Sequence, residues 1–497
     1  MAPLAEQDFQ SGRRYLIAAA ATLALPASIL AVQSLVGDTL VTLLLVGILV
    51  LLALPFVRGL LQGDLNLLEP VVVVSFLLAI AYPLQVLVPI LFEGYSSISL
   101  KVLYWEDHAL LRESLFYVAL GVATYLGAYY RAPQTLLQLG RTVGAGARIT
   151  RWEWRIMGVA LIGWGVRLYL VATGNYATFY KWSGHDPSTG ALFLAISQLA
   201  WFAYVLAWVH WFRGGRSAVS LALAAGLTLG EGSFHLIISA SKLYLAYLLV
   251  FPIMAAYLCR KRVPLLPLAG FGLALLLVVF PFVMQLRELQ EGWQPETTDP
   301  GLQVEMAYKI LENRFSLETF SNDESALALR EYFFLRFGGF ESLAVVLTEV
   351  PENADYLYFH DLLLLPLALV PRIVLPWKPE SLGVQTFSDQ VYQGGGGVSI
   401  YPIGDGYYNF GALGVVLLMG SWGLFHRWYY DSFFKPREKN PFVMAAFIYL
   451  LFTVTNLDEF IEMRYVALVQ HAAILGVVYL LLFRNFSLGI FHKSTHS

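Results

Sequence analysis

The chain has 497 residues, of which 58% are hydrophobic and only 13% are charged, and its net charge is −3. A soluble domain carries about 25% charged residues, so this composition excludes an ordinary soluble enzyme. The pI near 6.3 also gives no sign of a nucleic-acid-binding protein. Cys259 is the one cysteine, so no internal disulfide forms. A mean hydropathy of +0.62 and long apolar blocks predict an all-α, polytopic membrane protein.

Apolar blocks along the chain predict about twelve transmembrane helices. A helix needs about 20 apolar residues to cross a hydrocarbon core about 30 Å thick. The first block follows Arg13 and Arg14 as in a signal peptide, but it is long and another span follows at once, so we expect an anchor. In chain order the predicted spans are 15–36, 39–57, 71–92, 113–130, 155–173, 191–212, 218–239, 243–259, 264–284, 408–426, 441–457 and 465–483.

Basic residues in the connecting segments predict the orientation. With the N-terminus inside, the inner segments hold 19 of the 32 Lys and Arg residues and the short outer loops hold 5. Short loops carry the positive-inside signal, whereas long ones largely escape it. We therefore expect both termini to be cytoplasmic.

The segment 285–407 is predicted to lie outside the membrane between the ninth and tenth spans. It divides the chain into spans one to nine (1–284), the outer segment and spans ten to twelve (408–497), and it contains 18 of the 35 acidic residues. Its part 301–350 has the apolar spacing of two amphipathic helices. The run DLLLLPLALVPRIVLPW (361–377) is interrupted by three prolines. We expect this run to be re-entrant or interfacial and to line a cavity.

Four ionisable residues in or beside the spans are candidates for a binding site. Arg167 lies about twelve residues into the fifth span, where a permanent cation costs at least about 2.5–3.5 kcal/mol. Glu231 and His235 are four residues apart in the seventh span, hence on one helical face. Glu231 is either a substrate-binding residue or the structural ion-pair partner of Arg167. Lys242 opens the eighth span at the outer surface and is a candidate phosphate contact or an interfacial anchor.

The outer segment supplies further cations beside apolar sequence. Arg372 and Lys378 flank a proline-rich turn, VPRIVLPWKP, and Arg336 lies in FFLRFGGF. A guanidinium group presents a planar fork that matches phosphate oxygens. These three residues therefore predict binding of a phosphate group, although contacts with solvent or lipid headgroups would also explain them.

Candidate bases lie in the same outer segment. Asp405, in YPIGDGYYNFGALG, has a glycine on each side and directly precedes the tenth span, so it either accepts a proton from a hydroxyl or caps the helix. Asp389 and His360 are further candidates, and Tyr408 is a candidate substrate-binding residue. The glycine run 394–397 lacks the pattern of a phosphate-binding loop. The sequence has no motif of a serine hydrolase or a zinc protease. We expect neither a metal nor another cofactor.

Three features together resemble the bacterial polymerases of O-antigen and exopolysaccharide repeat units (Wzy-type). They are the twelve-span layout with a late outer segment, the run LLLLPLALVPRIVLPWKPES, and the element IGDGYYNFGALGVV. Family members have a similar PR-x-x-x-P-x-KP turn, followed by an acidic residue and a Tyr-x-Asn-Phe-Gly stretch. ISASKLYLAYLL is similar to their short basic motif at the mouth of a span. The residue match covers about 60 positions, and Asp405 stands where the family usually has glutamate.

The resemblance implies a GT-C-like membrane glycosyltransferase in the bacterial inner membrane. Donor and acceptor would both be polyprenyl-diphosphate-linked glycans, and the enzyme would transfer the growing glycan to a sugar hydroxyl, with inversion and without a metal. A chain-length regulator is an implied partner. Arg372 and Lys378 would hold the leaving diphosphate, with Arg167 and Lys242 completing the site, and Asp405 would receive the hydroxyl proton.

Other readings remain open at this point. O-antigen ligases share the architecture. A flippase or transporter of lipid-linked oligosaccharides would also place cations in a membrane cavity, but along a path through both leaflets. A membrane acyltransferase would need a histidine with an acidic neighbour, for which the sequence offers only His360–Asp361 and His185–Asp186.

Overall fold

The structure is a computed structural model of the chain. It describes residues 38–91, 108–133, 151–173, 187–237, 242–260, 270, 338–368, 370, 375, 377, 400–434, 440–457 and 460–483. Within these ranges every regular element is a helix and none is a strand. The predicted all-α class is therefore confirmed for the described part of the chain.

The helices follow the apolar blocks of the sequence. Short π-helical turns, Tyr430–Phe434 (η6) and Tyr479–Phe483 (η8), extend two of them. The α-helices are α2 (Thr39–Gln62), α3 (Pro70–Ala81), α4 (Pro83–Leu91), α6 (His108–Arg131), α7 (Trp152–Ala172), α8 (Pro187–Ser197), α9 (Leu199–Arg213), α10 (Ala218–Ile237), α11 (Lys242–Arg260), α16 (Gly339–Glu349), α17 (His360–Leu363), α18 (Leu365–Ala368), α20 (Pro402–Tyr429), α21 (Pro441–Thr455) and α22 (Ile461–Val478).

Seven described helical segments are long and apolar enough to cross a membrane. They coincide with the predicted spans two to six, ten and twelve. α11 and α21 match the predicted eighth and eleventh spans but offer shorter apolar stretches, and α10 matches the seventh. The first span and nearly all of the ninth lie outside the described residues. The coarse prediction of a polytopic membrane protein is thus supported, and the number twelve stays a prediction.

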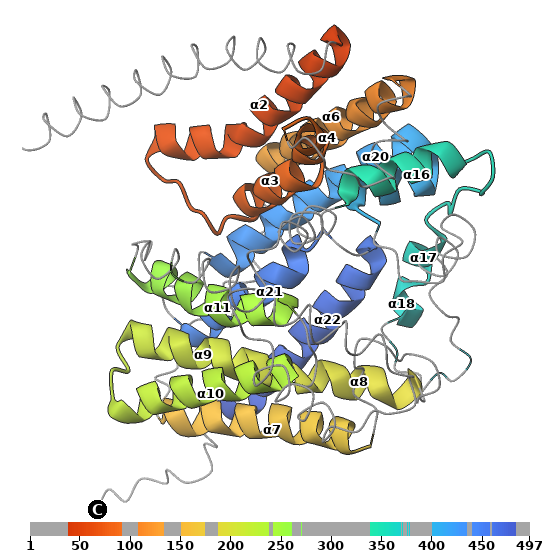
Figure 1. Ribbon diagram of the computed structural model, residues 1–497. Helices are drawn as coiled ribbons and strands as arrows, with labels where there is room; N and C mark the ends of the chain where they lie inside the picture. Colours follow the sequence, from red (N-terminus) through yellow and green to blue (C-terminus); the bar gives the residue numbers. More distant parts are fainter. Residues whose placement is uncertain are drawn as a thin grey trace, which may run out of the picture.

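The helices pack into two groups, each around its own apolar core (Figure 1). One group contains α2, α3, α4, α6, α16 and α20 and buries residues such as Leu45, Val118 and Met419. The other contains α7, α9, α10 and α11 and buries Trp201 and Phe202. α21 and α22 lie between the two groups in Figure 1, and both contribute buried residues to the second core.

The contacts between helix ends agree with the predicted alternation of the spans. Asp38 and Arg112, both predicted outside, form an ion pair in which Arg112 Nε donates to Asp38 Oδ2 at 3.1 Å. Tyr129, at the inner end of the predicted fourth span, donates a hydrogen bond of 2.7 Å to Glu69, which is predicted inside. These contacts support an up-and-down arrangement of α2, α3 and α6, because residues assigned to the same side do meet. Which side is cytoplasmic remains a prediction.

α20 differs from the straight tenth span that the sequence predicts at 408–426. It begins earlier, at Pro402, and its backbone leaves the helical region at Phe410 (φ −152°, ψ 30°) and Gly411 (φ 59°, ψ −141°). A Cβ atom on Gly406 would lie only 2.8 Å from the Cα atom of Val415, so the pieces before and after the break touch through their backbones. The conformation of Gly411 is open essentially to glycine alone. The element that carries Asp405 is therefore a separate helical piece packed on its own span.

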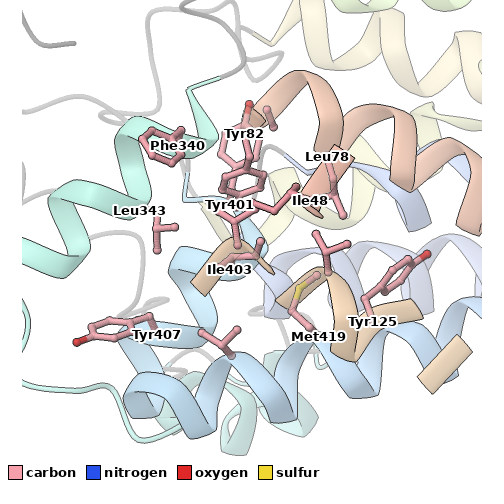
Figure 2. Packing of buried hydrophobic residues seen from close by; sticks show 14 of the residues in the cluster. Ile48, Leu78, Tyr82, Tyr125, Phe340, Leu343, Tyr401, Ile403, Tyr407 and Met419 are labelled. Atoms are coloured by element: carbon pink, nitrogen blue, oxygen red, sulfur yellow. The ribbon is translucent and has the colours of Figure 1, made fainter. Parts of the chain in front are cut away.

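The outer segment is described only in part. α16 is one of the two predicted amphipathic helices, and it buries Phe340, Leu343 and Val346 against the first core; Figure 2 shows Phe340 and Leu343 facing Tyr401 and Ile403. The other predicted helix lies outside the described residues. In the proline-interrupted run, the short helices α17 and α18 replace one continuous span, as the prolines require.

Candidate functional site

The predicted site residues fall into three sets. Asp405 and Tyr408 lie in the first piece of α20, and His360 follows a loop that binds this piece, whereas Arg167 and Glu231 form an ion pair in the second helix group. Lys242 is the first residue of α11. Arg336, Arg372, Lys378 and Asp389 lie outside the described residues.

Asp405 is fully buried in the first piece of α20. Pro402 starts this piece, because its fixed φ suits the first helical position. The carboxylate in the first turn also interacts favourably with the N-terminal end of the helix dipole. Asn409 lies one turn further on, and its Nδ2 donates to Asp405 Oδ1 at 3.0 Å and to the Asp405 carbonyl at 2.9 Å.

A loop from the outer segment binds the end of the same piece. The backbone N–H groups of Leu357 and Tyr358 donate to the carbonyls of Tyr408 and Asn409 at 3.0 and 3.1 Å, and the N–H of Phe359 donates to Asn409 Oδ1 at 2.9 Å. These bonds satisfy carbonyls that the break in α20 leaves without helical partners.

This loop connects the segment that carries His360 to the piece that carries Asp405 and Tyr408. His360 follows the loop directly and is exposed, whereas the Tyr408 side chain is fully buried. Asn409 makes the connection, since one end of its amide binds Asp405 and the other binds the residue before His360.

Arg464 is a buried cation that the sequence pattern does not single out. Its side chain is buried near the start of α22, with its guanidinium carbon 5.4 Å from the centre of the Trp422 ring. The Tyr82 hydroxyl lies within electrostatic range of both Arg464 and Asp405. Figure 2 shows Tyr82 beside Tyr401, the residue that precedes the Asp405 piece. In the sequence, Arg464 is one of the five basic residues of the short outer loops and directly precedes the last predicted span.

Arg167 and Glu231 form a fully buried ion pair in the second group. Arg167 Nη1 lies 2.9 and 2.8 Å from the two carboxylate oxygens of Glu231, and Nη2 donates to the Ser197 carbonyl at 3.3 Å. His235 Nε2 is 3.4 Å from Glu231 Oε2, so the predicted common face of Glu231 and His235 is confirmed. Of the two roles predicted for Glu231, the structure has the ion pair with Arg167.

Aromatic rings enclose this ion pair. The Arg167 guanidinium lies 4.9 and 4.8 Å from the ring centres of Trp164 and Phe234, and Trp201 stacks on His235 at 5.0 Å. Both Nη atoms of Arg167 are engaged, and its buried Nε has no hydrogen-bond partner among the described residues. A contact between Arg167 and a diphosphate therefore requires Glu231 to release the guanidinium.

Among the described residues, no three His, Cys, Asp or Glu side chains are grouped as ligands of a metal ion.

Comparison with known proteins identifies no relative of this chain. No protein-family model matches it, no curated protein matches, and no solved structure matches.

Proposed function

We propose that this protein is a membrane glycosyltransferase that polymerises polyprenyl-diphosphate-linked oligosaccharide repeat units on the outer face of a bacterial inner membrane. The observation that carries the proposal is the buried carboxylate of Asp405 in a broken helix, beside the loop that leads to His360. The sequence resemblance assigns this position to the same chemistry. Polar backbone at membrane depth is tolerated only beside protein or a wet cavity, as a site for a polar substrate requires.

In the proposed reaction, a hydroxyl oxygen of the acceptor sugar attacks the anomeric carbon of the donor glycan. The bond from that carbon to the diphosphate oxygen breaks, and the diphosphate departs with the bonding electrons. Asp405 receives the hydroxyl proton as the new glycosidic bond forms, a role that contributes typically 10²–10⁴-fold to a rate. A single displacement of this kind inverts the anomeric configuration.

Cations are needed where negative charge develops on the leaving diphosphate. Fixed cations in a site of low dielectric constant stabilise that charge without having to reorganise. We assign this role to Arg372 and Lys378 of the outer segment, with Arg336 and Lys242 as further contacts. Arg464 is a further candidate, since it is buried and lies, like Asp405, within electrostatic range of the Tyr82 hydroxyl. Arg167 is left out of this set, because Glu231 engages it.

A transporter of lipid-linked oligosaccharides is the second candidate. The buried Arg167, Glu231 and His235 favour it, because ionisable groups inside the membrane commonly mark a substrate or ion path. A transporter would move the glycan across the membrane without changing its length. An O-antigen ligase would use the same donor with a different acceptor.

Purified protein and a defined lipid-diphosphate repeat unit test these assignments. We expect a ladder of longer glycans, undiminished by EDTA; loss of the ladder in EDTA would contradict the metal-free mechanism. Added lipid A core should stay unmodified, whereas its glycosylation would identify a ligase. Proteoliposomes loaded on one side should show no translocation of intact units, and translocation without a ladder would identify a transporter.

The outer-segment cations are tested in the same assay. Arg372→Ala should abolish the ladder while the protein is still produced and inserted. Full activity of this variant would remove Arg372 from the site.

A further inference from the structure

Six aromatic side chains from α6, α20 and the loop that binds Asn409 form a continuous cluster, which we call the aromatic cluster. Within the cluster, the centres of neighbouring rings are between 4.9 Å (Tyr117–Tyr407) and 6.3 Å (Tyr356–Tyr407) apart. Tyr358 and Phe410 follow at 5.2 Å. The members are Tyr117, Tyr356, Tyr358, Phe359, Tyr407 and Phe410.

Three segments that are distant in sequence build the aromatic cluster. Tyr117 comes from α6, Tyr407 and Phe410 come from the first piece of α20 and its break, and the others come from the loop that binds Asn409. Figure 2 shows Tyr407 at the far end of the packed core from Tyr125. Tyr358 is 58% exposed and Phe410 is 37% exposed, so the cluster offers ring surface outside the core.

The aromatic cluster has polar groups among its rings. Four of its six members are tyrosines, and the hydroxyls of Tyr117 and Tyr407 lie within electrostatic range of the Glu113 carboxylate. Tyrosine combines a large, rigid apolar face with a group that donates and accepts hydrogen bonds. A ligand that fits such a surface has flat apolar faces and hydroxyls at its rim.

The loop of the aromatic cluster is held in an unusual conformation. Tyr358 and Phe359 have consecutive positive φ angles of 51° and 55°. Such backbone costs about 1–3 kcal/mol per residue for non-glycine residues, and it concentrates at functional sites. Hydrogen bonds from both residues to Asn409 hold it in place. Because Asn409 also binds Asp405, one side chain connects the loop of the cluster to the proposed catalytic carboxylate.

We propose that the aromatic cluster is a carbohydrate-binding subsite that stacks pyranose rings of the glycan substrate and positions them beside Asp405. A pyranose has an apolar face of C–H bonds and a rim of hydroxyls, which match the tyrosine faces and the tyrosine hydroxyls. An aromatic belt that only anchors the protein at the membrane surface needs neither the strained loop nor its connection to Asp405. The inference rests on the proposed function for the identity of the glycan.

Saturation-transfer difference NMR on the full-length protein in lipid nanodiscs tests the subsite. The probe is the pool of soluble oligosaccharides released by mild acid from the lipid-linked glycans of cells that carry this protein. We expect saturation transfer to ring C–H protons of the oligosaccharide. Tyr358→Asn, in which asparagine tolerates the positive φ, should raise the dissociation constant about three- to tenfold.

Matched variants separate ring stacking from general effects. Phe76→Ala removes a ring that is 57% exposed on α3, outside the aromatic cluster, and should leave binding unchanged. Tyr358→Trp keeps an aromatic face and should retain binding. If Tyr358 variants fail to fold, Phe410→Leu keeps apolar volume without the ring and should weaken binding similarly.

The outcomes distinguish this inference from the proposed function. Binding that depends on Tyr358, without any ladder from the lipid-linked substrate, supports the subsite and refutes the polymerase. A ladder with no measurable oligosaccharide binding, or with binding unaffected by Tyr358→Asn and Phe410→Leu, overturns the subsite alone. Unchanged binding together with lower stability in lipid would assign the rings to membrane anchoring and would also overturn it.

Discussion

Two of the buried charged groups among the described residues are built in opposite ways. Arg167 and Glu231 neutralise each other, with His235 against the carboxylate and aromatic rings around the guanidinium. Asp405 accepts a hydrogen bond from the neutral amide of Asn409, and the helix that carries both residues breaks at Phe410. The first group connects continuous helices, whereas the second connects a broken helix to an outer loop.

This difference indicates different roles for the two groups. Removing one partner of a buried ion pair leaves a buried charge without compensation, so such a pair tightly couples the helices that supply it. Irregular backbone beside a buried carboxylate is instead typical of sites that must admit a substrate. We therefore expect changes at Glu231 to affect stability first and changes around Asp405 to affect activity first.

The largest expected change in stability is at the closed pair. Glu231→Gln should lower the free energy of unfolding by about 3–5 kcal/mol, because it strands the Arg167 charge. Chemical unfolding in mixed micelles, followed by circular dichroism, measures this difference. The double variant Arg167→Met/Glu231→Leu should recover most of the loss, and a single variant as stable as the parent would contradict a structural role for the pair.

The same double variant sharpens the comparison in the activity assay. If Arg167 only joins helices, the double variant Arg167→Met/Glu231→Leu should keep a glycan transfer rate within about threefold of the parent, because apolar residues of similar volume can replace a buried ion pair. Rates are normalised to folded protein by size-exclusion chromatography. A rate reduced a hundredfold would return Arg167 to the substrate-binding residues that the sequence predicts.

A smaller effect is expected at the break in α20. Gly411→Ala should destabilise the protein by about 1–3 kcal/mol, because alanine strongly disfavours φ 59°, ψ −141°. The new Cβ atom would also lie 3.3 Å from the Tyr356 hydroxyl. Thermal unfolding measures the change. Gly476→Ala is the control, since no atom lies within 4 Å of its Cβ position, and equal melting temperatures for both variants would show that the break is not required.

The smallest effect is a pH dependence at the predicted inner surface. Burial raises the pKa of Glu69 above its usual value, and the hydrogen bond from Tyr129 offsets this only in part. Arg427, Asp64 and Arg58 are the other charges that act on it. Because the folded state binds this proton more tightly than the unfolded state, ionisation of Glu69 destabilises the fold as pH rises through the raised pKa.

Glu69→Gln removes this titration and keeps an acceptor for Tyr129. The melting temperature of the parent relative to the variant should therefore fall between pH 4 and pH 8. A difference that stays constant, or that rises with pH, would show that Glu69 does not titrate in this way.

The sequence predicted the features that depend on local pattern. Apolar blocks located α2, α6, α7 and α22, because each block is long enough to cross a membrane. The spacing of four residues predicted that Glu231 and His235 share a face.

Features that depend on long-range contacts were not predictable. The break at Gly411 and the capping of Asn409 by Tyr358 and Phe359 arise from backbone conformation and tertiary hydrogen bonds, which leave no periodic trace in the sequence. Arg464 was missed for a related reason: charge counting by loops assigns a side without showing that the side chain turns inward.

The most direct test of the proposed chemistry is glycan transfer by Asp405→Asn in a single-turnover assay with a defined lipid-diphosphate substrate. Asparagine keeps the size of the side chain but cannot take up the hydroxyl proton, so we expect the rate to fall at least about 100-fold. Asp431→Asn, which changes another buried carboxylate in η6, beyond the far end of α20, should transfer glycan at close to the parental rate. A parental rate for Asp405→Asn, with the fold intact, would contradict the assignment of Asp405 as the proton acceptor.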